Sequence, residues 1–168
     1  MRKLAIIAML ALVGVLALTA CGKKGGDEAQ QGTQVKYTRP TDPTDKTAWQ
    51  NYLGQILSSG KLMDGMTSNR PYVYYVTPGD DDQAQGERGR IMDQVSGALA
   101  RGVLPGTLLA FAGPSSSKTA DLVVKAFGDA QKGSLDKVIV VFIGDQADEQ
   151  RVADAVKPTG AIFRFAQM

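Results

Sequence analysis

The pattern Ser115-x-x-Lys118 contains the most reactive pair of side chains in this sequence. In a helix the lysine lies one turn after the serine, where its amine can take the hydroxyl proton and so activate a nucleophile. Ser115 and Ser116 equally suit the start of a helix, because a serine oxygen accepts a hydrogen bond from a free backbone N–H of the first turn. The stretch is therefore either a nucleophile or a helix cap, and we favour the cap.

Three successive carboxylates, Asp80, Asp81 and Asp82, form a second candidate site. Their oxygens can bind Mg²⁺ or Ca²⁺, but the calcium-loop pattern of alternating aspartates with a bidentate glutamate at the twelfth position is absent. Negative charge also stabilises the N-terminus of a helix, and a helix is expected from residue 83 onward. We favour the capping role, and we expect Asp145 to cap a later helix in the same way.

The sequence contains no histidine and a single cysteine, Cys21. Serine–histidine and cysteine–histidine nucleophiles and most zinc sites are thereby excluded. Any catalysis would depend on carboxylates, lysines or hydroxyls alone. We expect a protein that is not an enzyme and that needs no metal or cofactor.

The Ser115-x-x-Lys118 pattern resembles the nucleophile motif of penicillin-binding proteins and class A β-lactamases, which implies a serine that becomes acylated. The accompanying motifs of those enzymes are missing. The sequence has no Ser-Asp-Asn, and Lys118-Thr119-Ala120 overlaps the first motif instead of forming a separate Lys-Thr-Gly. The helix cap therefore explains these serines better.

The N-terminal leader combines a basic start, Met1-Arg2-Lys3, with an apolar run from Leu4 to Leu18, as secretory signal peptides do. Its end, Leu18-Thr19-Ala20-Cys21, resembles the lipobox of bacterial lipoprotein precursors at every position. The resemblance implies cleavage before Cys21, a diacylglyceryl group on its sulfur and a third acyl chain on the new amino group. Three acyl chains would hold the protein on its membrane almost permanently.

Gly22 follows the cysteine, where an aspartate in this family favours retention on the inner membrane. By resemblance we expect an outer-membrane lipoprotein whose domain faces the periplasm. Residues 21–43 are rich in Gly, Gln, Thr and Pro and have few apolar side chains, which predicts a disordered tether. The predicted organisation is a signal peptide over residues 1–20, this tether, and one α/β domain over residues 44–168.

The mature chain has 17 basic and 17 acidic residues, because Arg2 and Lys3 leave with the leader. A formal charge of zero argues against nucleic-acid binding, which needs a basic excess on one face. The expected partners are the membrane, through acylated Cys21, and another envelope or secreted protein.

Helix-like and strand-like runs alternate in the predicted domain. Apolar residues recur at three- and four-residue spacing in the expected helices, over residues 47–58, 83–100, 116–127 and 147–156. Strand-like runs lie at residues 72–76, 107–111, 137–143 and 161–165. This alternation predicts an α/β fold, a three-layer sandwich with a mostly parallel four-stranded sheet after an N-terminal helix. Right-handed crossovers are expected to place helices on both faces, and Arg164 suits the last strand to a sheet edge.

Ligands of open parallel sheets bind outside the carboxyl ends of the strands. The loops expected there, residues 77–82, 112–118 and 144–146, contain the candidate residues Asp80, Asp81, Asp82, Ser115, Ser116, Lys118 and Asp145. Convergence of these side chains would indicate a small hydrolase or ligand-binding protein. We favour a non-enzymatic protein-binding or accessory module of the cell envelope, such as an assembly factor or an inhibitor of a secreted toxin.

Tyr72, Tyr74 and Tyr75 lie in one strand-like run and have two interpretations. Aromatic side chains are enriched at protein interfaces, and they also pack where a helix covers a sheet. We favour packing. Several arginines are interpreted as a solvated polar face, with a partner-binding surface as the alternative: Arg88, Arg90 and Arg151.

Overall fold

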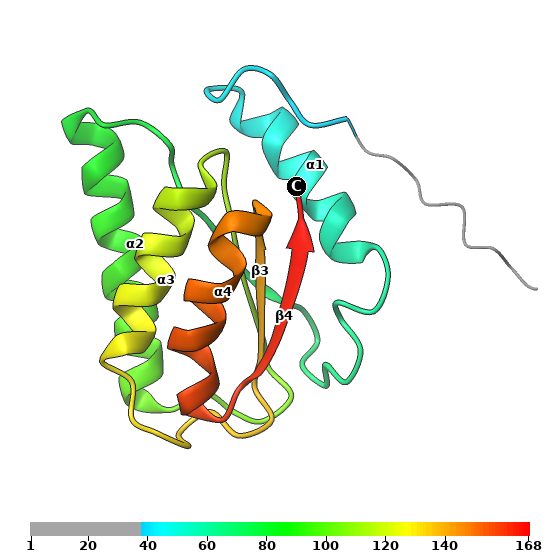
Figure 1. The fold of residues 1–168 in the computed structure, drawn as a ribbon, viewed down its shortest axis with the longest axis vertical. Coiled ribbons are helices and arrows are strands. Elements are labelled where there is room, and N and C mark those ends of the chain that lie inside the picture. The colour runs from blue at the N-terminus through cyan, green and yellow to red at the C-terminus, as the bar shows by residue number, and fades with distance from the viewer. Residues whose placement is uncertain (1–37) are drawn as a thin grey trace, which may run out of the picture. The chain divides into compact units, whose positions relative to one another are not determined.

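The computed structural model describes residues 38–168, and Figure 1 shows their helices and strands in the predicted alternation. The leader, Cys21, Gly22 and the tether up to residue 37 lie outside the described residues. The helices are α1 (Lys46–Ser58), α2 (Asp82–Arg101), α3 (Ser116–Gly128), α4 (Gln146–Val156) and the short 3-10 helix η1 (Lys157–Thr159). The strands are β1 (Tyr72–Tyr75), β2 (Leu108–Ala112), β3 (Ile139–Gly144) and β4 (Ile162–Gln167).

The four strands form one parallel sheet in the order β1-β2-β3-β4. This arrangement confirms the predicted α/β sandwich with a parallel sheet. The two central strands, β2 and β3, are buried along their whole length, as their unbroken apolar sequences require. Arg164 lies in β4, an edge strand, as predicted.

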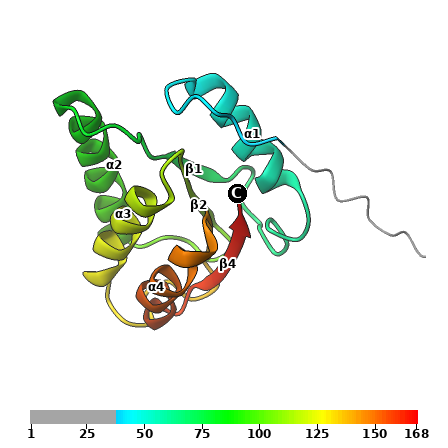
Figure 2. The same ribbon diagram turned by 45° about the horizontal axis from the view of Figure 1, so that its top comes forward.

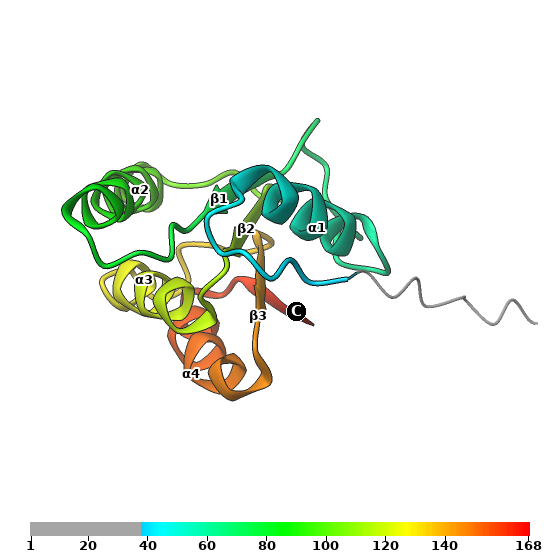
Figure 3. The ribbon, with the colours of Figure 1, turned by 90° about the horizontal axis from the view of Figure 1, so that it is seen from above.

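Helices cover both faces of the sheet, as predicted. The prediction that the crossover connections place them there is wrong. Because the strand order never reverses, each right-handed crossover returns on the same side, and α2, α3 and α4 all pack on one face. The opposite face is covered by α1, which precedes the first strand. Figures 2 and 3 show α1 on one side of the sheet and the other three helices on the other side.

Alternating side chains of the central strands therefore enter two separate apolar cores. On the three-helix side, Phe111 stacks on Tyr74 with ring centres 5.1 Å apart and meets Phe127 edge-on at 5.8 Å. On the α1 side, Trp49 and Tyr52 pack against side chains of β2 and β3. The predicted apolar stripe of α1 thus faces the sheet.

The carboxyl ends of the first strands approach each other closely at Gly113. A Cβ at this position would lie 2.2 Å from the carbonyl oxygen of Val76, a distance that no real side chain tolerates. Gly144 is similarly confined, since a Cβ there would lie 2.3 Å from the ring of Phe142 and 2.7 Å from the hydroxyl of Ser116. These two glycines fix the backbone from which the candidate loops begin.

The segment before α1 lies against the domain. Asp45 caps α1, since its carboxylate accepts a hydrogen bond from the N–H of Ala48 at 2.9 Å. The indole N–H of Trp49 donates to the carbonyl of Asp42 at 2.9 Å. Residues 38–43, the end of the predicted tether, are therefore attached to the first helix.

Candidate functional site

The carboxylates of the acidic loop after β1 contact nearby groups of the protein and do not gather at one point. Asp81 caps α2, with its carboxylate accepting from the N–H of Ala84 at 2.9 Å, which confirms the capping role. Asp82 begins the helix and is exposed. Asp80 forms an ion pair with Lys118 of α3. The three carboxylates therefore diverge, and in residues 38–168 no group of three or more potential metal ligands is found.

The Ser115-x-x-Lys118 stretch forms a helix cap, as favoured above. The hydroxyl oxygen of Ser115 accepts from the N–H of Lys118 at the start of α3. The Lys118 amine is directed to Asp80 and has no hydrogen bond to the serine hydroxyl. The pair is therefore not arranged for proton transfer from serine to lysine.

Ser116 has a different role, which sequence analysis missed. Its side chain is buried, donates to the carboxylate of Asp148 at 2.5 Å, and accepts from the N–H of Asp145 at 2.8 Å. Arg151 holds the same Asp148 carboxylate at 2.8 Å and also pairs with Asp121. This network joins the N-terminal turns of α3 and α4.

Asp145 occupies the N-cap position of α4, but its side chain makes no capping hydrogen bond, so the predicted capping role is wrong. The carboxylate instead pairs with the guanidinium of Arg39 at 3.0 Å. The same guanidinium donates to the carbonyl of Pro114 at 3.3 Å and lies 5.5 Å from the centre of the Trp49 ring. Arg39 thus binds the Asp145 carboxylate, which therefore does not cap α4. Arg39 also connects the segment before α1 to the candidate loops 112–118 and 144–146.

Two of the arginines interpreted as a solvated face are structural. Arg88 donates to the carbonyls of Thr77 and Gly79 at 2.7 and 2.6 Å, which fixes the loop after β1 on α2. Arg151 forms the network described above, and Arg90 is exposed. The solvated-face interpretation is therefore wrong for Arg88 and Arg151.

Local hydrogen bonds and charges shift several ionisable groups at this end of the sheet. The hydrogen bond and positive charge of Lys118 lower the pKa of Asp80, and the N–H of Ala84 lowers the pKa of Asp81. A hydrogen bond from Thr77 lowers the pKa of Glu87. These carboxyl groups therefore stay charged to a lower pH than isolated carboxyl groups do.

The candidate residues do not converge on one cavity. Asp81 lines a hollow of about 290 Å³ beside α1, whereas Lys118 lines a separate groove between α2 and α3. Open parallel sheets bind ligands where the strand order reverses, and this sheet has no such reversal. The common cavity that the alternative of a small hydrolase or ligand-binding protein requires is therefore not formed by these side chains.

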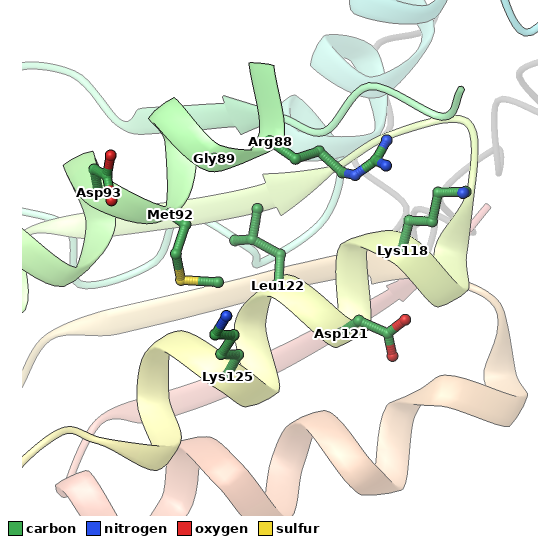
Figure 4. Close-up of a pocket in the computed structure, with 8 residues that line it drawn as sticks. All are labelled: Arg88, Gly89, Met92, Asp93, Lys118, Asp121, Leu122 and Lys125. Atoms are coloured by element: carbon green, nitrogen blue, oxygen red, sulfur yellow. The ribbon is translucent and has the colours of Figure 1, made fainter. Parts of the chain in front are cut away.

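The groove between α2 and α3 has a volume of about 490 Å³ and is open to solvent. Figure 4 shows the side chains of Met92 and Leu122 between the two helices, with Arg88 and Lys118 extending at one end. Its lining comprises Arg88, Gly89, Met92 and Asp93 of α2 and Lys118, Asp121, Leu122 and Lys125 of α3. An apolar floor is therefore bordered by charges of both signs.

The groove arises because α2 packs incompletely. Only Ala84, Val95 and Leu99 are buried along its 20 residues. A Cβ added at Gly86 or Gly89 would meet nothing within 4 Å. The weak apolar stripe and the glycines of α2 are visible in the sequence and are the signal by which the groove could have been predicted.

No family model, curated protein or solved structure was found to match this chain. Within the described residues, no helix is long and apolar enough to cross a membrane.

Proposed function

We propose that this chain is an outer-membrane lipoprotein, anchored through acylated Cys21, whose periplasm-facing domain is a non-enzymatic module that binds another envelope or secreted protein. The lipobox resemblance of Leu18-Thr19-Ala20-Cys21 supports the anchor. The observation that supports the binding function is the open α2–α3 groove, with its apolar floor and charged border.

The chemistry of the groove favours a protein surface over a small substrate. Protein interfaces combine an apolar centre with a polar rim, and here Met92 and Leu122 are surrounded by charged side chains. Methionine adapts its shape to a partner, because it is unbranched and flexible. Asp93 and Lys125 form no ion pair within residues 38–168, so both remain available to charges on a partner.

The anchor is tested in the native bacterium by mass spectrometry of the membrane-extracted protein. We expect an N-terminal Cys21 that has lipid on its sulfur and amine. Cys21→Ser should move the protein from the membrane to the soluble fraction. An intact Met1 leader, or an unmodified Cys21 thiol, would refute the anchoring proposal.

The groove is tested with two matched glycine substitutions in the anchored protein. Gly89→Tyr places a ring in the groove, whereas Gly86→Tyr places the same ring on α2 outside the groove lining. Both replace an exposed helical glycine, so they have similar effects on helix propensity. After chemical cross-linking in cells, a partner protein identified by mass spectrometry should remain with Gly86→Tyr and be lost with Gly89→Tyr. Equal retention by both variants would exclude the groove as the binding surface.

A further inference from the structure

Strand β1 has a neighbouring strand on one side only. The N–H of Val76 donates to the carbonyl of Ala112 at 2.8 Å, so the backbone of this residue points toward β2. Backbone groups alternate in direction along a strand, and those of Val73 and Tyr75 therefore point away from the sheet. Within residues 38–168 they have no hydrogen-bond partner. The outer edge of β1 thus offers donors and acceptors to another strand.

The first two side chains of β1 are also accessible. Tyr72 is 56% exposed and Val73 is 52% exposed. Proteins usually protect edge strands with charges, prolines or bulges, but all four residues of β1 are uncharged and have high strand propensity. The opposite edge, β4, contains Arg164, which donates to the carbonyl of Leu62 at 2.7 Å in the loop after α1. Strand β1 is therefore the edge better suited to pairing.

A hollow of about 370 Å³ lies beside β1 and is lined by that strand and by residues of α1 and α2. Its charged residues are Lys46, Glu87 and Arg90. Glu87 accepts a hydrogen bond from the hydroxyl of Thr77 at 2.6 Å, whereas Lys46 and Arg90 form no ion pair with any described residue. The Lys46 amine lies 5.6 Å from the centre of the Tyr75 ring. The charges of Lys46 and Arg90 both act on Glu87 and help to lower its pKa, so two cations face one carboxylate and the hollow beside the free edge has a net positive charge.

We propose that the outer edge of β1 binds an extended acidic segment of a partner protein, which adds to the sheet as a fifth strand. Backbone hydrogen bonds to Val73 and Tyr75 provide attachment, and carboxylates beside Lys46 and Arg90 provide selectivity. A second copy of this chain fits less well, because pairing two β1 edges brings the same cations together. The inference is independent of the proposed function, since this edge uses neither the anchor nor the α2–α3 groove.

The test uses the mature chain from residue 21 with Cys21→Ser, which keeps it in solution. The probes are two blocked synthetic peptides, Thr-Val-Glu-Val-Glu-Val-Thr and its counterpart with lysines in place of the glutamates. In amide-resolved NMR titrations, the glutamate peptide should shift the signals of Val73 and Tyr75 and slow their hydrogen exchange. The lysine peptide should bind at least about tenfold more weakly.

Two variants separate backbone pairing from side-chain contact. Val73→Pro removes the outward N–H, and an edge strand tolerates a proline at such a position, so this variant should fold and bind the peptide about tenfold more weakly. Val73→Ala retains the N–H and should weaken peptide binding about threefold or less. Arg90→Glu should reverse the preference between the two peptides.

Each of three results would overturn this inference: equal binding of both peptides, unchanged binding by a folded Val73→Pro variant, or no binding at about 5 mM peptide. Sedimentation experiments show whether the chain dimerises. A dimer that is lost in the Val73→Pro variant would assign the edge to a second copy instead. Gly89→Tyr lies outside this edge and should not weaken peptide binding, so failure here and failure of the groove proposal can be distinguished.

Discussion

Replacement of Ser116 by alanine should destabilise the domain more than replacement of either neighbouring serine. The Ser116 hydroxyl is buried and makes two hydrogen bonds, to the Asp148 carboxylate at 2.5 Å and from the Asp145 N–H at 2.8 Å. A hydrogen bond to a charged group contributes about 1.5–3 kcal/mol. A fully buried N–H left without an acceptor costs about 1–3 kcal/mol, and the part-buried N–H of Asp145 should lie at the lower end of that range. Arg151 still holds Asp148 in the variant, which limits the loss. We therefore expect Ser116→Ala to lower the free energy of unfolding by about 3 kcal/mol.

The adjacent serines provide controls within the same helical turn. Ser115→Ala removes the cap of α3 and should cost about 1 kcal/mol. Ser117 is exposed and its hydroxyl contacts only that of Ser115, so Ser117→Ala should change stability by less than about 0.5 kcal/mol. Urea unfolding of the mature chain with Cys21→Ser gives all three values from the midpoints and slopes. A cost for Ser116→Ala no greater than that for Ser117→Ala would refute the buried network.

Four further experiments test the fold and its electrostatics. Gly113→Ala should cost about 3 kcal/mol or more, because its Cβ would lie 2.2 Å from the carbonyl oxygen of Val76. Gly54→Ala, in the open middle of α1, should instead stabilise by about 0.5–1 kcal/mol, and urea unfolding compares the two variants. Lys118→Met should raise the pKa of the Asp80 carboxyl toward its usual value, as measured by NMR titration. The pKa of the Glu87 carboxyl is lower in the folded protein than its usual value of 4.5. The charged carboxylate therefore contributes fully to stability above pH 4.5, and this contribution is lost as the pH falls through the lower folded pKa. Glu87→Gln should make stability decline less steeply in acid, as measured by urea unfolding at a series of pH values. Backbone amides of α2 should exchange with deuterium faster than those of α3, because α2 buries fewer side chains; equal rates would contradict this difference in packing.

The order and type of the elements could be predicted because each has a local signal. The consecutive apolar residues of β2 and β3 indicate strands covered on both faces, and the stripe of α1 indicates a helix on a sheet. The side on which each helix packs depends on strand order, which no local pattern contains. Strands in sequential order place every crossover helix on one face of the sheet. The expectation of crossover helices on both faces assumed that the strand order reverses within the sheet.

The candidate site was predicted less well because its contacts join distant parts of the chain. Asp81 and Ser115 cap the helices that they precede, and such caps are readable from neighbouring residues. Asp145 has the same local pattern, but its carboxylate pairs with Arg39, which lies 106 residues earlier. Ser116 likewise bonds to a residue in another helix. A local pattern therefore identifies a polar side chain without identifying the partner that decides its role.

Helix α2 separates the two proposed surfaces, with the α2–α3 groove on one side and the edge of β1 on the other. Its glycines Gly86, Gly89 and Gly97 each cost about 1 kcal/mol of helix stability relative to alanine, and only three of its side chains are buried. Helix α2 therefore has less support from helix propensity and from fully buried side chains than α3 has. A partner on either side would supply apolar contact that the isolated domain lacks, and part of the binding free energy would be used to stabilise α2. Substitutions that stabilise α2 without entering either surface, such as Gly86→Ala, should therefore strengthen binding at both.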